Sequence, residues 1–318
     1  MMPRDLVSRT STHGSRLGLA DIKEDAESGN RVVCFAVGGS QNLERVIDQA
    51  WAWAKTSFVH TSDEIHLVHV QGLVAGLVGN TGNPAALQAT PLARNWIPKR
   101  ILNDLDRYKA HKLVHLHHDG AIAGALCDYA ERVGAEAIVI GSRDLTAYHR
   151  ILLGSVSKAI LSRAGCAVAV VRLGPQPTPR QTIRPRHVVI ALNDDEASSS
   201  VIEAAKCCLL FDDIITLLSI TTSAAERGKR RSFLTQHMIG MQKDFQKCQV
   251  KVFASAENNT SKTLVDVING ATPKISLVIC GSRRSLAKQW LGLGLGSVSE
   301  FLVDHVEACG VLVVKKGM

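Results

Sequence analysis

The 318-residue chain contains one internal repeat, and this repeat restricts its fold more than any other feature. The run AIVIGSR at 137–143 recurs as LVICGSR at 277–283, and GSVS at 154–157 recurs unchanged at 296–299. In each half a cysteine and a short β-branched run follow in the same order, Cys166 before 167–172 and Cys309 before 310–315. A repeat of this kind indicates one structural unit used twice. The sequence therefore predicts two copies of one fold, each with its own sheet.

Prolines mark the boundary between the copies, at positions 175, 177, 179 and 185. Proline removes a backbone donor and favours extended chain over a helix or a central strand. We therefore place domain 1 at 31–172, a linker at 173–185 and domain 2 at 186–318. Residues 1–30 show no apolar periodicity, so we expect a disordered tail. Their Arg, Ser and Thr content is also faintly similar to an organellar transit peptide, an alternative that the sequence leaves open.

Within each half, short apolar runs alternate with segments of helical period, which is typical of β-α-β units around a parallel sheet. One apolar helical stripe runs from Leu43 to Ala54, with Trp53 off it, and another from Ile122 to Val133, with Gly134 placed to end it in a left-handed conformation. The sequence predicts the α/β class, as two tandem, doubly wound, flavodoxin-like domains, each a five-stranded parallel sheet with helices on both faces. The expected strands are 32–37, 65–70, 112–117, 137–140 and 168–171, then 188–192, 214–220, 249–254, 275–279 and 311–314.

Charge and composition narrow the classes of function. The formal charge is +8, but neither basic cluster, 227–231 or Arg180 with Arg184 and Arg186, is interleaved with aromatic residues. We therefore expect solvated surface rather than nucleic-acid binding. No apolar run approaches the roughly 18 to 20 residues of a membrane span. The 8 cysteines form no C-x-x-C, which favours reduced, buried thiols and a cytoplasmic location. Cys207 and Cys208 adjoin on a predicted helix and are expected to face different directions.

These repeated elements resemble the universal stress protein family, and the chain looks like a tandem, two-domain member. The resemblance covers about residues 31 to 315. It rests on the strand ending in Gly-Ser-Arg, the Gly-Ser-Val-Ser that opens the last helix and the cysteine before the last strand. The resemblance implies a stress-response role with an unidentified protein partner and a homodimer left open. It also implies ATP binding at the carboxyl ends of the strands, and pairing of 168–171 with 311–314 within one chain.

A phosphate site can also be argued from chemistry, because glycine lets the backbone approach a phosphate and a helix N-terminus offers unpaired N–H groups. Gly154 and Gly296 lie in that position. The serines could instead only cap helices, most clearly in Ser297-Val-Ser-Glu300, which has the pattern of a capping box. The residues expected to bind ATP or AMP in the first half are Ala36, Val37, Gly38, Val70, Gly141, Ser142, Arg143, Gly154, Ser155, Val156 and Ser157. A weaker second site would comprise Asn193, Gly281, Ser282, Arg283, Gly296, Ser297 and Ser299.

Both sites depart from the family's ATP-binding pattern. Gly38 and Asn193 stand where ATP-binding members carry an acidic residue at the end of the first strand. Asp144 and Arg284 stand where those members have a second glycine, and an Asp144 carboxylate facing the crevice would repel phosphate. The second loop is also two residues longer than the first, 281–296 against 141–154. We therefore expect at most one competent nucleotide site, in the first half.

The sequence predicts a binding and regulatory module that requires no cofactor. The alternative is a nucleotide-free interaction scaffold with degenerate sites. A weak ATP hydrolase is the least favoured, because no nucleophile, base and orienting residue can be assembled from the sequence. His115 and His117 share one face of a predicted strand with Asp119 nearby, a geometry that could hold a metal. A half-exposed strand face is the favoured interpretation, and we predict no metal site.

Overall fold

The computed structural model describes residues 31–38, 44–72, 97–118, 121–142, 153–172, 185–193, 197–255, 259–282 and 297–315. The first half contains β1 (Val32–Val37), α2 (Glu44–Ser57), β2 (Glu64–Gly72), α3 (Lys99–Leu105), β3 (Ala110–His118), α4 (Ile122–Arg132), β4 (Ala137–Ser142), α5 (Ser155–Arg163) and β5 (Ala167–Arg172). The second contains β6 (His187–Ala191), α6 (Ala197–Lys206), β7 (Ile214–Thr221), α7 (Ala224–Met241), β8 (Lys247–Ala254), α8 (Thr260–Asn269), β9 (Leu277–Ser282), α10 (Ser297–His305) and β10 (Gly310–Lys315).

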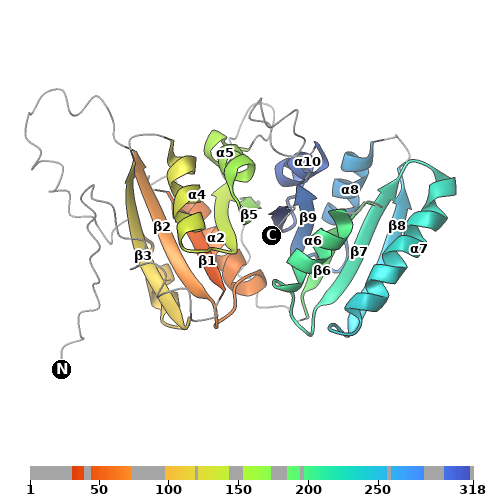
Figure 1. The fold of residues 1–318 in the computed structure, drawn as a ribbon, viewed down its shortest axis with the longest axis horizontal. Helices are drawn as coiled ribbons and strands as arrows, with labels where there is room; N and C mark the ends of the chain where they lie inside the picture. Colours follow the sequence, from red (N-terminus) through yellow and green to blue (C-terminus); the bar gives the residue numbers. More distant parts are fainter. Residues whose placement is uncertain are drawn as a thin grey trace, which may run out of the picture.

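The strands lie in the order β3-β2-β1-β4-β5-β10-β9-β6-β7-β8, so each half repeats the same five-stranded order. Pairing within each half is parallel. The halves meet where β5 and β10 pair antiparallel, with Val170 opposite Val311. All ten expected strands are present, the ninth shifted to Leu277–Ser282. The last strands pair within the chain, as the resemblance implied, and this pairing joins the two five-stranded halves into one sheet (Figure 1).

Each face of the sheet carries its own hydrophobic core, and each core includes residues of both halves. Successive strand residues point to opposite faces, so Val33 and Phe35 of β1 join one core and Cys34 joins the other. Helices α2, α3, α6 and α7 supply buried residues to the first core, and α4, α5, α8 and α10 to the second. This arrangement confirms the doubly wound α/β class.

Local sequence accounts for the helix that approaches the middle of the molecule. The predicted stripe of α2 is buried at Val46, Ile47, Ala50, Trp51 and Ala54. Trp53, off that stripe, lies against the other half, where its Nε1 donates to the Ser276 carbonyl at 3.0 Å. A Cβ added to Gly310 would come within 2.4 Å of its ring, so that glycine admits the tryptophan. Gly134, after α4, has φ of +63°, as predicted for a left-handed helix stop.

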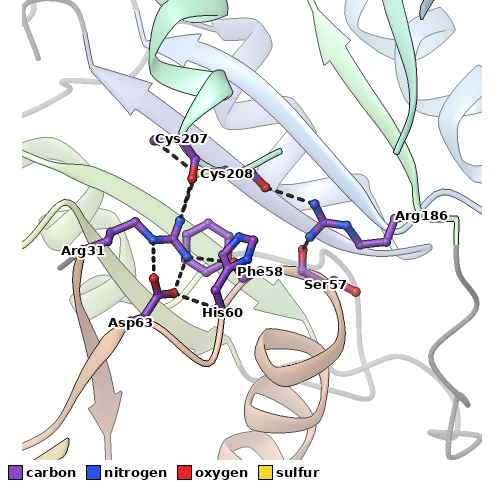
Figure 2. Close-up of polar contacts among 8 residues, drawn as sticks. All are labelled: Arg31, Ser57, Phe58, His60, Asp63, Arg186, Cys207 and Cys208. Atoms are coloured by element: carbon purple, nitrogen blue, oxygen red, sulfur yellow. Dashed lines mark hydrogen bonds and ion pairs between the residues drawn. The ribbon is translucent and has the colours of Figure 1, made fainter. Parts of the chain in front are cut away.

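Two arginines join the halves at the amino ends of the strands, in a reciprocal arrangement that we call the arginine clamp (Figure 2). Arg31 immediately precedes β1, and its Nε donates to Asp63, immediately before β2, at 3.1 Å. Arg186 immediately precedes β6, and its Nε donates to Asp213, immediately before β7, at 2.8 Å. Each arginine also binds a carbonyl of its own half, Phe58 at 2.9 Å and Cys208 at 3.1 Å respectively.

The remaining nitrogen of each guanidinium reaches across to the opposite half. Arg31 Nη1 lies 3.4 Å from the Cys207 carbonyl, and Arg186 Nη1 lies 2.5 Å from the Ser57 carbonyl. The Arg186 and Asp213 side chains are 3% and 0% exposed, so this pair is held away from solvent. The planar, multidentate donor set of arginine suits such a position. The expectation that Arg186 belongs to a solvated basic cluster is therefore wrong.

A second reciprocal pair joins the halves where the last strands end. Arg172 ends β5 and donates to the Asp304 carbonyl in the last turn of α10. Lys315 ends β10 and donates to the Leu161 carbonyl in the last turn of α5. Cations are favoured near helix C-termini, whose carbonyls lack intrahelical partners. Among the described helices, none is long and apolar enough to cross a membrane.

The clamp predicts unequal costs for two arginine substitutions. Arg186→Met should lower the free energy of unfolding by about 3 kcal/mol or more, because it leaves the buried Asp213 carboxylate without its charged partner. Arg100→Met, which removes the exposed Arg100–Asp48 pair, should cost no more than about 1 kcal/mol. Urea titrations of the two variants and the parent chain give the comparison. Equal midpoints for both variants would contradict a structural role for the clamp.

Candidate functional site

The predicted nucleotide-binding residues of the first half gather at the carboxyl edge of its sheet. Because β1 pairs in parallel with both β2 and β4, the strand ends at Gly38, Val70 and Ser142 face the same edge. Ala36 and Val70 are half-buried, whereas Val37 and Ser142 are buried. Arg143 lies outside the described residues. Sequence reasoning thus placed these residues together correctly, and whether they bind a nucleotide stays a prediction.

The start of α5 lies at this edge because the helix follows β4. Gly154 is the N-cap residue, in an extended conformation, and no side-chain capping hydrogen bond forms there within the described part of the chain. The first backbone bond of the helix runs from the Lys158 N–H to the Gly154 carbonyl, 3.0 Å. Ser155 and Val156 are exposed, whereas Ser157 is buried. The interpretation of Ser155 as a capping residue is therefore wrong, since Ser155 is already the first helical residue.

A carboxylate from the second half lies beside the start of α5. The Leu153 N–H donates to Asp304 Oδ1 at 3.0 Å, and Asp304 is buried in α10. Lys158 of α5 and Glu300 of α10 approach to 3.7 Å further along the two helices. The candidate phosphate position is thus also a contact between the halves, which the sequence did not predict.

The two predicted glycines of the first half have different structural roles. A Cβ added to Gly141 would lie 2.6 Å from Val46 Cγ1 of α2, so this glycine allows the helix to pack closely against the strand end. A Cβ added to Gly154 would meet nothing within 4 Å. Among the described residues nothing would touch a Cβ at Gly154, whereas Gly141 serves the core.

The corresponding residues of the second half are engaged by the protein itself. Ser299 Oγ donates to the Gly281 carbonyl at 2.6 Å, and the Asn193 carbonyl accepts from Ser198 Oγ at 2.7 Å. Gly281 repeats the packing role of Gly141, because an added Cβ would lie 2.5 Å from Val201. Ser282 is buried.

The predicted capping box of the second half differs from the observed arrangement. Ser297 is the first residue of α10 rather than its cap, and Glu300 approaches Lys158 of the first half. The Ser297 side chain, Arg283 and Gly296 lie outside the described residues. The structure thus offers no capping contact for Glu300 in the part of α10 that it describes.

Histidines of β2 and β3 form contacts of their own. His115 Nδ1 lies 3.1 Å from His69 Nδ1, while the His117 side chain and Asp119 lie outside the described residues. Nearby, buried His66 bridges Glu64, at 2.7 Å, and the Tyr129 hydroxyl, at 2.9 Å. No group of three or more His, Cys, Asp or Glu residues able to hold a metal occurs in the described ranges.

Glu64 is held ionised by its neighbours. Burial acts to raise the pKa of this carboxyl, but hydrogen bonds from His66 and Lys112 outweigh it and lower the pKa below its usual value. A carboxyl in this state at neutral pH is not a general acid. The contact of His66 with the Tyr129 hydroxyl links β2 to α4.

Sequence reasoning missed the clamp and misplaced two cysteines. An arginine before the first strand and an aspartate before the second strand occur in both halves, a repeat that self-comparison could have found. The expectation that Cys207 and Cys208 lie on a helix and face apart is wrong. Helix α6 ends at Lys206, Cys207 is exposed, and the two Sγ atoms lie 3.5 Å apart.

The two glycines predict different outcomes for the same substitution. Gly141→Ala should destabilise the fold by roughly 1 to 3 kcal/mol, because the new methyl group collides with Val46. Gly154→Ala places its methyl group in open space and should change stability by less than about 1 kcal/mol. Thermal unfolding of both variants tests the assignment, and a larger loss for Gly154→Ala would reverse it.

Comparison with known proteins agrees with this architecture. Residues 29–172 match the sequence model of the universal stress protein family. A universal stress protein of Methanocaldococcus jannaschii is 29% identical over 100 residues, which span 31% of this chain and about half, 51%, of that relative.

Two solved structures extend the likeness to both halves. A universal stress protein from Archaeoglobus fulgidus superposes with a TM-score of 0.56 at 16% identity, covering 89% of this chain and 98% of that one. A universal stress protein assigned from Pseudomonas aeruginosa superposes with a TM-score of 0.54 at 14% identity, covering 90% and 94%. At such identities the likeness concerns the fold. Residues 29–172 thus form a universal stress protein domain by sequence, and the second half, which repeats its strand order and motifs, fits a second domain of the same fold.

Proposed function

We propose that this stress-response protein is a regulatory binding module, and that its first half binds an adenine nucleotide, ATP or AMP, with the phosphates at the start of α5. The observation that carries the proposal is the open N-cap at Gly154, which combines free space with a helix terminus lacking a side-chain cap in the described structure. Backbone N–H groups at such a terminus suit an anion, because their dipoles align toward it. The exposed Ser155 hydroxyl supplies a further donor.

The nucleoside would lie toward the ends of β1 and β2. Gly38 and Val70 are both half-buried there and offer backbone groups and apolar surface. Gly38 supplies no carboxylate for the ribose hydroxyls, so fewer polar contacts would fix the nucleoside. We therefore expect modest affinity, with Kd on the order of 10 to 500 μM.

A regulatory effect would pass through the interface between the halves. The Leu153 N–H, one residue before the cap, is bound by Asp304 of the second half. A phosphate at Gly154 would add negative charge close to that carboxylate, so occupancy and the fit of α10 against α5 become linked. Nucleotide-dependent exposure of a partner surface is the mechanism we propose for signalling.

The second candidate function is an interaction scaffold without nucleotide. It is favoured by the engagement of Ser299 with the Gly281 carbonyl, which removes that hydroxyl from a phosphate role in the second half. It is also favoured by the missing carboxylate in both halves, at Gly38 and Asn193. Under this hypothesis the continuous sheet and the clamp would present one rigid surface to a protein partner.

Titration calorimetry with ATP and AMP distinguishes the two functions. The parent chain should bind one nucleotide, and Gly154→Val should weaken binding at least tenfold by filling the approach to the helix terminus. Gly165→Val is the matched control, since an added Cβ at Gly165 also meets nothing within 4 Å and this residue follows the opposite end of α5. Absence of heat at millimolar nucleotide would leave the scaffold as the supported function. Equal loss in both variants would place binding elsewhere.

Asp304 provides a test of the phosphate position. Asp304→Asn keeps an oxygen acceptor for the Leu153 N–H but removes the negative charge beside the helix start. Nucleotide affinity should rise about three- to tenfold at low salt, and the gain should shrink as ionic strength rises. An unchanged Kd for Asp304→Asn, measured beside a binding-competent parent, would move the phosphates away from α5.

A further inference from the structure

Two adjacent thiols lie within the arginine clamp, in the turn that follows α6. Cys207 Sγ and Cys208 Sγ are 3.5 Å apart, with Cys207 exposed and Cys208 buried (Figure 2). Arg31 of the first half places Nη1 3.4 Å from Cys208 Sγ and 3.4 Å from the Cys207 carbonyl. The pair therefore combines an accessible thiol, a second thiol within contact distance and a permanent positive charge.

We propose that Cys207 and Cys208 form a peroxide-sensitive dithiol, in which oxidation closes a disulfide between the two residues and alters the contact between the halves. Cys207 is the attacking residue because it is the exposed member, and Cys208 is the resolving residue because its sulfur already lies beside Cys207. This inference is independent of nucleotide binding, since Cys208 and α6 pack on one face of the sheet and Leu153 and α5 on the other.

The surroundings favour a thiolate at Cys207. The hydrogen bond from Cys208 lowers the pKa of Cys207 to about 7, with a further contribution from the Arg31 charge. Burial and the Glu136 carboxylate oppose this shift, and protonated Cys207 donates to the Ala204 carbonyl at 3.0 Å. The same pairing raises the pKa of Cys208 well above its usual value, so Cys208 stays protonated. A thiolate beside a protonated neighbour is the arrangement that separates attacking from resolving thiols.

The reaction with hydrogen peroxide balances in two steps. The Cys207 thiolate attacks one peroxide oxygen, the O–O bond breaks, and the departing hydroxide takes a proton to form water, leaving Cys207 as a sulfenic acid. Cys208 then loses its proton and its sulfur attacks the Cys207 sulfur, and the displaced hydroxide leaves as a second water. Two sulfur atoms are oxidised to a disulfide, and one peroxide is reduced to two waters.

Closing this disulfide would strain the clamp. Adjacent Cα atoms are about 3.8 Å apart, shorter than the 4.4 Å or more usual for disulfides, so the backbone of both residues must rotate. The carbonyls of these same residues accept hydrogen bonds from Arg31 and Arg186. Oxidation would therefore disturb contacts from both arginines. A strained disulfide is also readily reduced, so the change should reverse with a thiol reductant.

Mass spectrometry of the peroxide-treated protein tests the proposal directly. Trypsin releases the peptide 207–227, whose only cysteines are these two. Treatment of the full reduced chain with a small excess of hydrogen peroxide should lower this peptide's mass by about 2 Da, and dithiothreitol should restore it. In Cys208→Ser the same treatment should leave a sulfenic acid at Cys207 that dimedone traps. The proposal would be overturned if dimedone labelled Cys208 in the Cys207→Ser variant. It would also be overturned if both thiols of the parent chain stayed intact after peroxide treatment.

Two matched variants separate chemistry from folding. Cys207 alkylation by iodoacetamide at pH 7 should be about tenfold faster than that of the half-buried Cys248, and its rate should rise with a midpoint near the Cys207 pKa. Arg31→Met should slow Cys207 alkylation roughly threefold or more, whereas Arg186→Met, which disrupts the same clamp, should leave the rate within about twofold. Equal rates for Cys207 and Cys248, or equal slowing by both arginine variants, would refute the assigned role of Arg31.

The oxidised parent should melt at a lower temperature than the reduced one, and an unchanged melting temperature would refute the link to the clamp.

Discussion

The structure depends on charges that each half buries with the help of the other. Arg186 is held by Asp213 of its own half, yet it also donates to the Ser57 carbonyl of the opposite half. Arg31 makes the equivalent set of contacts in the reverse direction. In an isolated half the arginine would keep the aspartate of that half but would lose the carbonyl acceptor from the opposite half. The last strand, which now pairs with its counterpart, would be left as an exposed edge. Burying a guanidinium is tolerable only when its donors find acceptors, so the two halves stabilise each other through this clamp.

The joined edge explains why the repeated halves need not function alike. The last strands pair antiparallel, and α5 and α10 lie across from each other, linked by Lys158 and Glu300 and by Leu153 and Asp304. The carboxylate of α10 thus borders the open start of α5. In the second half Ser299, the counterpart of buried Ser157, donates to the Gly281 carbonyl at the strand end. The described start of α5 carries no side-chain cap, whereas the described residues of the second half are committed to packing.

Both proposed sites touch the contact between the halves, on opposite faces of the sheet. Nucleotide would bind where Asp304 crosses to α5, and peroxide would react where Arg31 crosses to the turn after α6. A shared interface offers a physical route by which either event could change the other, because each alters hydrogen bonds that span it. The repeat therefore does more than duplicate one fold, because it brings reactive or charged side chains of one half into contact with the other half.

The α/β class, the repeat and the ten strands were predictable from sequence, because hydrophobic period and glycine placement are local properties. The buried stripe of α2 and the left-handed Gly134 followed from the same reasoning. Local patterns could not reveal that Arg186 is buried, that Asp304 reaches Leu153, or that Cys207 and Cys208 turn toward each other. Those contacts join residues far apart in the chain, or follow from where a helix ends. Only the pairing of β5 with β10 brings the two halves close enough to create them, since it fixes their distance and orientation through backbone hydrogen bonds.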